Sequence, residues 1–259
     1  MRKLASCAAL LDIFLLAHGA AGAEIWKPKP VTTFSWFLAT STGKSTAQAV
    51  DLDLFEADAK TVAAFKAKGQ KTICYISVGS WENWRPDKAA FPKSIIGKAY
   101  QGWPGEYWLD IRKIAVLGPI LRKRLDLCKS KGFDAVEPDN LDGYEQASGF
   151  AITRAQQVRF INWLGKEAHA RSLSIGLKNV PELIPDVIGN YDWALAEDCF
   201  AQKSCADFKP MANAGKAVFS VEYTDNKINF AAFCKESKAL RFFGLLKNRD
   251  LDAFERPCP

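Results

Sequence analysis

Patterns typical of buried strands alternate along the chain with patterns typical of amphipathic helices. In the segment 114–131, for example, Leu117, Leu121, Leu125 and Cys128 recur at spacings of four, four and three, which places them on one apolar helix face. Short apolar runs bounded by turn residues favour strands. The pattern predicts eight strands, at 33–38, 71–77, 107–110, 135–139, 173–178, 193–197, 217–223 and 242–246, with helices between them at 57–68, 114–131, 154–170, 181–189 and 230–239.

This alternation predicts an α/β fold, a single (β/α)8 TIM barrel, because strands that alternate with helices form a parallel sheet and eight such units close it. Thr153 is a predicted helix N-cap, and Gly69, Gly132 and Gly215 each lie where a helix is expected to stop before the next strand. A doubly wound open sheet is the alternative, but no glycine-rich phosphate loop follows the first strand. We find no repeat or interdomain linker, which favours one domain.

The first residues have the composition of a secretory signal peptide. Arg2 and Lys3 provide a positive start, residues 10–17 an apolar stretch and residues 21–23 (AGA) a small-residue cleavage site. The stretch is too short, and too interrupted by Asp12, for a membrane span. We therefore predict a signal peptide at 1–23, a mature barrel domain at 24–259 and export to the periplasm or the extracellular space; an uncleaved anchor is the alternative.

Cysteine usage agrees with export. Six cysteines follow the leader, an even number typical of a disulfide-bonded secreted chain, although fifteen pairings are formally possible. Cys199 and Cys205 would close a short loop, so we pair them first. The remaining predicted pairs are Cys234 with Cys258 and Cys74 with Cys128, and six free thiols are the alternative.

Charge and histidine content narrow the chemistry. The net charge of +6 is carried by scattered basic residues without a nucleic-acid motif, so we expect no nucleic-acid partner, and we expect a monomer. Past the leader only His169 remains, at the end of a helical pattern where a solvated or capping role is expected. A histidine-rich metal site is thereby excluded, and no cysteine spacing resembles a zinc site. We expect no cofactor and no metal, and carboxylate chemistry.

Two strand-like runs end on a carboxylate just before a turn, one at Asp139 and the other at Glu197. A buried ionised carboxylate must be paired or hydrogen-bonded, and the carboxyl ends of parallel strands are where sites form. Two such acids on different strands suggest the acid and nucleophile of a glycosidase. We prefer Glu197, in a partly apolar setting that would raise its pKa, as the acid and Asp139 as the nucleophile; the reverse assignment stays open.

Further residues near the predicted strand ends are expected to line the same barrel mouth. Glu137 shares a strand face with Asp139 and either contacts substrate or supports a residue that does. Trp81 either stacks on a sugar or packs within a lid, and Lys178 either binds sugar hydroxyls or pairs with a neighbouring acid. The predicted substrate-binding set is Trp36, Tyr75, Trp81, Asp110, Glu137, Asn140, Lys178, Asn179, Asp198, Glu222 and Tyr223.

Several runs, in order along the chain, resemble glycoside hydrolase family 114, the endo-α-1,4-polygalactosaminidases, also described as TIM-barrel spherulin-4-like proteins. The resemblance spans roughly residues 30 to 225. It is carried by residues 74–80 (CYISVGS), 84–87 (WRPD), 102–112 (GWPGEYWLDIR), 132–140 (GFDAVEPDN), 176–179 (GLKN), 197–200 (EDCF) and 221–223 (VEY).

The resemblance implies retaining hydrolysis inside an α-1,4-linked galactosamine polymer, with Asp139 and Glu197 as the catalytic pair. Where the family commonly has Gln this chain has Asp198, an extra acid suited to binding a cationic sugar or to changing the working pH. Acids around the mouth of an otherwise basic protein suit a substrate that carries ammonium groups. The alternatives are a barrel glycosidase acting on another glycan and a non-catalytic polysaccharide-binding protein.

Overall fold

The chain folds into an eight-stranded parallel barrel. The structure, a computed structural model, describes residues 24–39 and 44–259. The barrel strands are parallel neighbours in chain order, and a short antiparallel strand, β12, extends the sheet beyond the eighth. They are β1 (Phe34–Phe37), β2 (Ala49–Asp53), β3 (Lys71–Ser77), β7 (Ala135–Asp139), β8 (Ser174–Lys178), β9 (Trp193–Glu197), β10 (Ala217–Tyr223) and β11 (Phe243–Lys247), followed by β12 (Glu255–Pro257).

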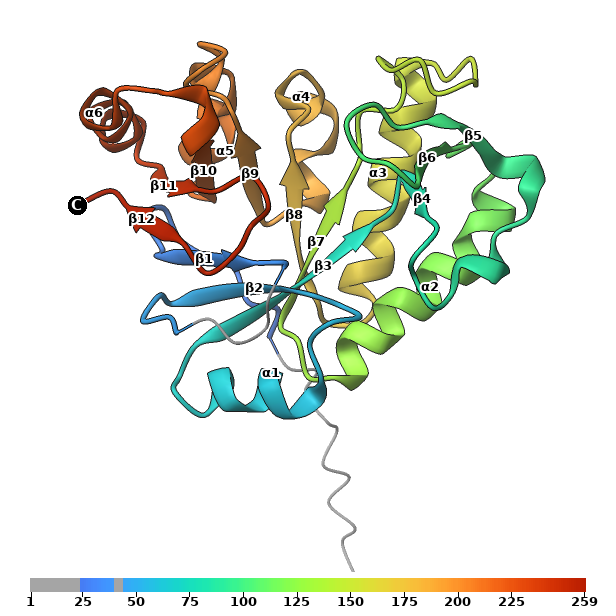
Figure 1. Ribbon diagram of the computed structural model, residues 1–259, viewed down its shortest axis with the longest axis horizontal. Helices are drawn as coiled ribbons and strands as arrows, with labels where there is room; N and C mark the ends of the chain where they lie inside the picture. Colours follow the sequence, from blue (N-terminus) through green and yellow to red (C-terminus); the bar gives the residue numbers. More distant parts are fainter. Residues whose placement is uncertain (1–23, 40–43) are drawn as a thin grey trace, which may run out of the picture.

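The two ends of this sheet meet, so the barrel is nearly closed. β1 lies next to β11, and the Ser35 hydroxyl on β1 donates to Glu255 Oε1 on β12 at 2.9 Å. The predicted (β/α)8 barrel is confirmed. In Figure 1 the strands β3, β7 and β8 run towards the same end of the molecule, where the loops after the strands gather.

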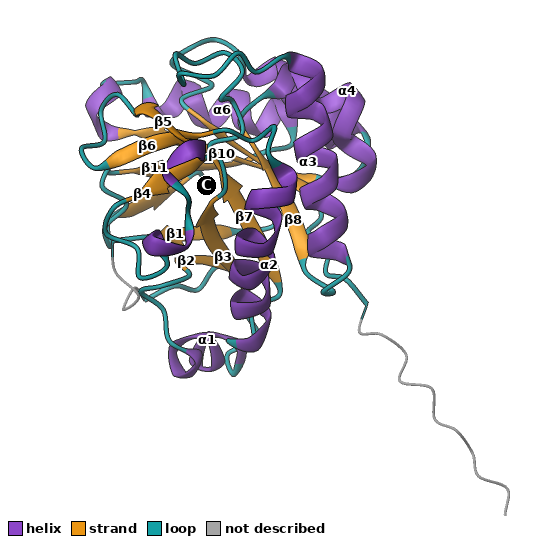
Figure 2. Cartoon of the chain, turned by 90° about the vertical axis from the view of Figure 1, so that its right-hand side faces the viewer, coloured by secondary structure: helices purple, strands orange, loops and turns teal. Residues whose placement is uncertain are grey.

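Helices cover the outside of the barrel (Figure 2). They are α1 (Ala59–Lys66), α2 (Ile114–Ser130), α3 (Arg154–His169), α4 (Ile184–Val187), α5 (Lys209–Asn213) and α6 (Phe230–Leu240). The predicted cap of α3 is confirmed, because the Thr153 side chain accepts from the Gln156 amide and the Gln156 side chain accepts from the Thr153 amide. This reciprocal pair satisfies amides that the first turn of a helix leaves free.

One of the eight predicted strands lies outside the barrel. The predicted strand 107–110 corresponds to β6 (Glu106–Leu109), which pairs antiparallel with β4 (Ser80–Glu82) and β5 (Ile96–Ala99) in a small separate sheet. Its place in the barrel belongs to β2, which reads AVDLD and was missed. Two aspartates interrupt its apolar pattern because their side of the strand faces a polar part of the barrel interior.

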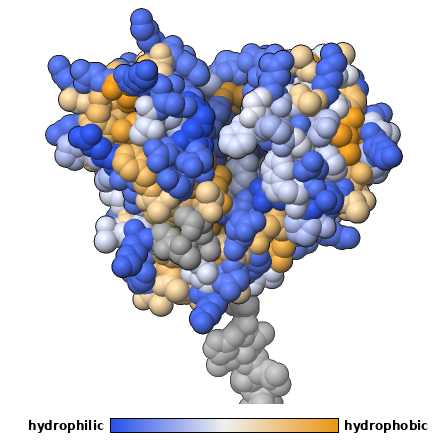
Figure 3. All heavy atoms as spheres, in the orientation of Figure 1, coloured by the Kyte–Doolittle hydropathy of each residue, from blue (hydrophilic) through white to orange (hydrophobic). Residues whose placement is uncertain are grey.

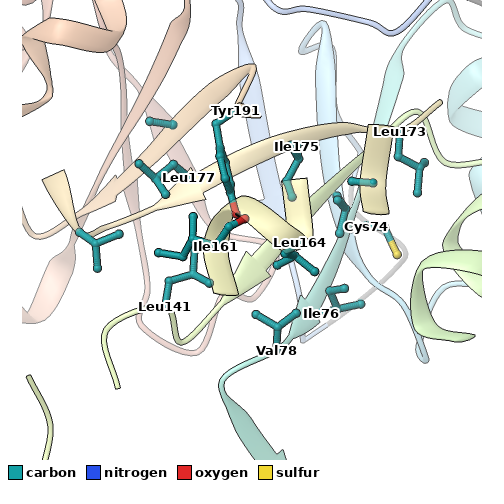
Figure 4. Close-up of a cluster of buried hydrophobic side chains, with 14 of the residues drawn as sticks. Cys74, Ile76, Val78, Leu141, Ile161, Leu164, Leu173, Ile175, Leu177 and Tyr191 are labelled. Atoms are coloured by element: carbon teal, nitrogen blue, oxygen red, sulfur yellow. Dashed lines mark hydrogen bonds between the residues drawn. The ribbon is translucent and has the colours of Figure 1, made fainter. Parts of the chain in front are cut away.

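Alternate residues on the strands pack into two separate apolar clusters. Val136 on β7 belongs to the cluster between the barrel and its helices, whereas Ala135 belongs to the cluster inside the barrel. Figure 4 shows the outer cluster, where Ile161 and Leu164 of α3 lie against Ile175 of β8. Because side chains alternate with period two, Glu137 and Asp139 point inward with Ala135.

All three predicted disulfides are present. Cys74 on β3 is joined to Cys128 on α2, Cys199 to Cys205 in the loop after β9, and Cys234 on α6 to Cys258 beside β12. The first and third tie helices to the barrel, and the second closes the loop next to Glu197.

The predicted signal peptide, residues 1–23, lies outside the described residues. Within residues 24–39 and 44–259, none of the helices combines the length and the apolar character needed to cross a bilayer.

Candidate active site

An acidic cleft of about 890 Å³ opens at the carboxyl ends of the barrel strands. The space-filling view shows the surface hollowed between the side that carries α6 and the side that carries the small sheet β4–β6 (Figure 3). Asp139 at the end of β7 and Glu197 at the end of β9 both line it, together with Lys178 at the end of β8. The three strands are neighbours in the barrel, so their last residues meet on the cleft floor.

Three donors surround the Asp139 carboxylate. The Tyr75 hydroxyl donates to Asp139 Oδ2 at 3.0 Å, the Asn140 backbone amide donates to Oδ1 at 2.8 Å, and Lys178 Nζ lies 3.2 Å from Oδ2. These three contacts fix the orientation of the Asp139 carboxylate.

The Glu197 carboxylate has a matching set of donors. The Tyr223 hydroxyl donates to Oε1, the Asn179 side-chain amide donates to Oε2 at 3.2 Å, and Lys178 Nζ lies 3.2 Å from Oε2. One ammonium therefore contacts both carboxylates, and the two oxygens that it contacts are separated by no more than twice 3.2 Å.

The electrostatics of Glu197 differ from our expectation. Burial disfavours its charged form, but the Lys178 ammonium and the hydrogen bonds from Tyr223 and Asn179 outweigh burial and hold the pKa of Glu197 below its ordinary value. The expected raised pKa is wrong for the substrate-free cleft. Burial also opposes the charge of Lys178, yet three neighbouring carboxylates raise its pKa well above the ordinary value.

Each of the three strand ends is followed by a residue with a left-handed backbone. Asn140, Asn179 and Asp198 have φ values of 63°, 54° and 56°. Asn and Asp tolerate this conformation better than other residues with a side chain. The turn ends each strand directly after Asp139, Lys178 or Glu197. It also brings the Asn179 side chain back to Glu197, where its Oδ1 accepts from the Glu197 amide at 3.0 Å.

A further acid near the cleft floor, Glu106, was missed from the predicted site. Glu106 Oε1 accepts from the Ser80 hydroxyl and from the Asn140 side-chain amide at 2.8 Å, and Glu106 lines the cleft. Burial together with the nearby charges of Asp139 and Glu82 raises the pKa of Glu106 to about 7. Its strand was predicted but assigned to the barrel, which hid its position beside Asn140.

Acids outnumber bases in this cleft. Of the described residues that line it, eleven are Asp or Glu and three are Lys or Arg, although the whole chain carries a net charge of +6. The three basic residues are already paired: Arg85 with Asp53 and Glu82, Lys178 with the floor acids, and Arg249 with Asp198 and Asp225. The cleft is therefore suited to a cationic ligand.

The structure brings most of the predicted site residues together, and five lie away from the cleft. Glu137 is fully buried below the cleft floor, with Oε1 3.0 Å from Lys178 Nζ. Trp36 is fully buried beneath Lys178, whose Nζ is 4.6 Å from its ring centre. The Trp81 indole donates to the Lys88 carbonyl at 3.0 Å. Glu222 is buried and accepts from the Phe200 amide at 2.7 Å, behind the cleft wall.

Asp110 is the fifth. Its strand belongs to the small sheet, so the expectation that Asp110 ends a barrel strand is wrong, and its carboxylate pairs with Arg112 at 2.7 Å. The tryptophans that do line the cleft are Trp84 and Trp103, which are 48% and 49% exposed. Both come from the loops around β4–β6, which explains why barrel reasoning could not select them over Trp81.

Other candidate chemistry is not found at this mouth. His169 Nε2 lies 2.8 Å from Asp192 Oδ2, at the end of α3. Across the two described stretches of the chain, no group of three or more His, Cys, Asp or Glu side chains is arranged to hold a metal ion.

Comparisons with known proteins agree with this geometry. The model of glycoside-hydrolase family GH114 matches residues 16–259. The crystal structure of Aspergillus fumigatus Ega3 in complex with galactosamine is 36% identical, with a TM-score of 0.86, and the match covers 93% of this chain and 100% of that one.

More distant similarities are found to one solved structure and to one further sequence. The glycoside hydrolase domain of PelA from Pseudomonas aeruginosa is 14% identical, with a TM-score of 0.69, over 87% of this chain and 98% of that one. An uncharacterized protein of Deinococcus radiodurans is 23% identical over 213 residues, which are 72% of this chain and 67% of its own. With a family model that spans nearly the whole barrel and an acidic cleft built on two strand-end carboxylates, the chain belongs to glycoside hydrolase family GH114.

Proposed function

We propose that this protein is an exported, endo-acting hydrolase of α-1,4-linked galactosamine polymers that works with retention of configuration. The observation that carries the proposal is the pair Asp139 and Glu197, held by one ammonium at the floor of an acidic cleft. The similar Ega3 structure, which contains galactosamine, supports this class of sugar.

In the proposed reaction Asp139 attacks the anomeric carbon. Glu197 donates a proton to the glycosidic oxygen as its bond to that carbon breaks, which leaves a glycosyl ester on Asp139. Glu197 then takes a proton from water, and the resulting attack on the anomeric carbon releases Asp139. Retaining enzymes place the two carboxyl groups about 5–5.5 Å apart, against about 6.5–9.5 Å in inverting ones. The two oxygens that share Lys178 are no more than twice 3.2 Å apart, which is compatible with the short separation that retention requires.

The donor sets alone do not divide the roles, because each carboxylate has a tyrosine, an amide and Lys178. We keep Asp139 as the nucleophile and Glu197 as the acid/base, and azide rescue tests the assignment. Asp139→Ala should give a glycosyl azide of inverted configuration, since azide replaces the nucleophile, whereas Glu197→Ala should give the retained azide. If Asp139→Ala gave the retained azide and Glu197→Ala the inverted one, Glu197 would be the nucleophile and Asp139 the acid/base.

Recognition of the amine is assigned to acids that no protein cation neutralises. Glu106 is only 7% exposed, and Asp142 lines the same part of the cleft; neither forms an ion pair with any residue in the described parts of the chain. Burial raises the pKa of both carboxyls. A substrate ammonium placed between them would supply the missing counter-charge.

The walls of the cleft suit a polymer. Trp84 and Trp103 present exposed rings at the side formed by the β4–β6 sheet, where pyranose rings can stack. The three disulfides support export, because such bonds persist in oxidising compartments. We propose that the exported protein acts as a monomer.

Release of reducing ends from partly deacetylated α-1,4-galactosamine polymer tests the function. Wild type should release oligosaccharides, and Asp139→Asn and Glu197→Gln should each lower the rate by at least about a thousandfold while the fold and polymer binding persist. Cleavage at the wild-type rate by either variant would refute the catalytic pair. If the wild type cleaves another glycan but not this polymer, the proposed substrate is wrong. If it binds the polymer but cleaves no glycan, it is a polysaccharide-binding protein.

A further inference from the structure

Two carboxyl groups lie beneath the catalytic pair, inside the barrel. Asp51 on β2 and Glu137 on β7 are both fully buried, and each is the other's neighbour in the interior. Asp51 points inward because its strand neighbours Val50 and Leu52 belong to the outer cluster. Neither group is available to solvent or to a polymer in the cleft.

Among the described residues, a cationic partner is found for Glu137 but not for Asp51. Lys178 Nζ lies 3.0 Å from Glu137 Oε1, so Glu137 is ion-paired. Asp51 has no ion pair, and neither of its oxygens accepts a hydrogen bond of ordinary geometry from any residue the structure describes. The backbone amide of Leu52 and the carboxyl of Glu137 are its polar neighbours, with Lys178 farther away.

An ionised Asp51 in this position would be an isolated buried charge next to a second negative charge. Such a charge costs more than the stability of a whole domain in the idealised case, so the group takes up a proton instead. A proton on Asp51 also gives Glu137 a hydrogen-bond donor in addition to its ion pair with Lys178, since neither Glu137 oxygen accepts a hydrogen bond of ordinary geometry from the residues that the structure describes. Burial, followed by the charge of Glu137, raises the pKa of Asp51 well above its ordinary value.

We propose that Asp51 is a protonated positioning residue that donates a hydrogen bond to Glu137, and that the pair forms a fixed single negative charge holding Lys178 between the catalytic carboxylates. Lys178 Nζ is 3.0 Å from Glu137 and 3.2 Å from both Asp139 and Glu197. Its fixed position depends on an attraction from below that balances the attraction from the cleft.

The anchor is important when the reaction changes the charge of the cleft. In the proposed mechanism Asp139 loses its charge on forming the ester, and Lys178 loses one of three partners. Glu137 keeps the ammonium in place through that step, so the same cation is ready when Asp139 becomes a leaving group. Without Glu137, Lys178 would move towards the remaining carboxylate, Glu197.

Infrared difference spectroscopy of wild type against Asp51→Asn tests the proton directly. At alkaline pH, above the pKa of about 7 of Glu106 and of Glu222, wild type should still show the carbonyl stretch of a protonated carboxylic acid that Asp51→Asn lacks. Absence of this band in wild type would overturn the proposal. Because it needs no substrate, this experiment can succeed even where the proposed function fails.

The pH dependence of polymer hydrolysis tests the positioning role and rests on the proposed function. Asp51→Asn keeps a neutral donor for Glu137, so both limbs of the kcat/KM profile should stay in place. Glu137→Gln removes the negative charge, which should move both limbs to lower pH by about one unit. A shifted kcat/KM profile in Asp51→Asn would contradict the proposal, and so would an unshifted profile in folded Glu137→Gln. If Glu137 had only a structural role, Glu137→Gln would lower stability and leave both limbs in place.

Discussion

Lys178 and Lys247 end two strands of the same barrel and have opposite electrostatics. Both are buried, and both ammonium groups lie over an aromatic ring, 4.6 Å from the Trp36 centre and 4.7 Å from the Phe37 centre. Lys178 has three carboxylates within 3.2 Å, whereas the hydrogen bond of Lys247 goes to the Asp252 carbonyl at 2.8 Å.

The pKa values follow these partners. Burial lowers the pKa of Lys247 to about 8, since carboxylates near it are too distant to compensate. The same burial penalty at Lys178 is exceeded by Asp139, Glu137 and Glu197, and its pKa is raised. Burial alone therefore does not decide the charge of a lysine in this barrel; the first neighbours do. One lysine is a permanent cation in the cleft, and the other is close to losing its proton.

Removing each ammonium should separate the two roles. Lys178→Met leaves Glu137, Asp139 and Glu197 without their cation, so we expect kcat/KM to fall by about a hundredfold or more and the free energy of unfolding to fall by about 3–5 kcal/mol. Lys247→Met should keep activity within about threefold, because Lys247 does not touch the cleft floor. Steady-state kinetics measure the activity of both variants, and denaturant titration measures their stability. Equal losses of activity in the two variants would contradict the different roles of Lys178 and Lys247.

The ammonium group of the substrate should pair with the cleft acids that have no cationic partner, as Lys178 pairs with Asp139 and Glu197. Glu106→Gln should lower kcat/KM for free-amine oligosaccharides by about tenfold, the loss of one charge-assisted contact of about 1.5 kcal/mol, and should spare acetylated ones. Since the pKa of Glu106 is about 7, the wild-type preference for the free amine should grow as pH rises through 7.

Glu145→Gln is the matched control for that measurement, because Glu145 is an exposed acid on the same cleft. It removes the same charge without removing a buried carboxyl, so the ratio between free-amine and acetylated substrates should stay at the wild-type value. If the ratio changed equally in both variants, the preference for the free amine would come from the overall electrostatic field of the cleft and not from Glu106.

The lowered pKa of Glu197 predicts the pH profile. As the acid, Glu197 must be protonated, and its pKa lies below the ordinary value, so activity should fall as pH rises from acid towards neutral. Tyr223→Phe removes a hydrogen bond to the charged form, which should raise the pKa of Glu197 and move the basic limb to higher pH by up to about one unit. A basic limb that does not move would count against Glu197 as the acid.

The smallest effect concerns stability around Lys247. Its folded-state pKa of about 8 is below the ordinary 10.5, so the unfolded chain binds more protons between these values. Stability contributed by this group is therefore lowest below pH 8 and rises towards pH 10.5. Relative to Lys247→Met, wild type should gain melting temperature over that window; a gap constant with pH would show that Lys247 does not titrate there.

Much of the fold could be predicted because most strands carry an apolar pattern on both faces. β2 was missed, since Asp51 and Asp53 alternate with its few apolar residues and interrupt the short apolar run that marks a strand. β6 was detected as a strand, but pairing partners are decided by contacts distant in sequence, so its antiparallel sheet could not be inferred. The predicted number of barrel strands was therefore right, but β6 was assigned to the barrel in place of β2.

The cleft floor could be predicted from the rule that acids at strand ends form sites. Asp139, Lys178 and Glu197 are the last residues of their strands, and the structure brings them together. Glu106 and Trp84 come instead from the antiparallel insertion, whose packing against the mouth has no local sequence signal. The pKa of Glu197 was missed because its donors Tyr223 and Asn179 lie on two other strands.

The three left-handed residues that follow the strand ends limit which sequences can occupy this site. In a saturation library at Asn140, Asn179 and Asp198, the backbone favours Asn, Asp and Gly and disfavours β-branched residues at φ values of 54–63°. Few substitutions can therefore be sampled next to Asp139, Lys178 and Glu197 without strain. Changes in specificity are more accessible in the β4–β6 insertion, which contacts the substrate side of the cleft without carrying the turns that end the barrel strands.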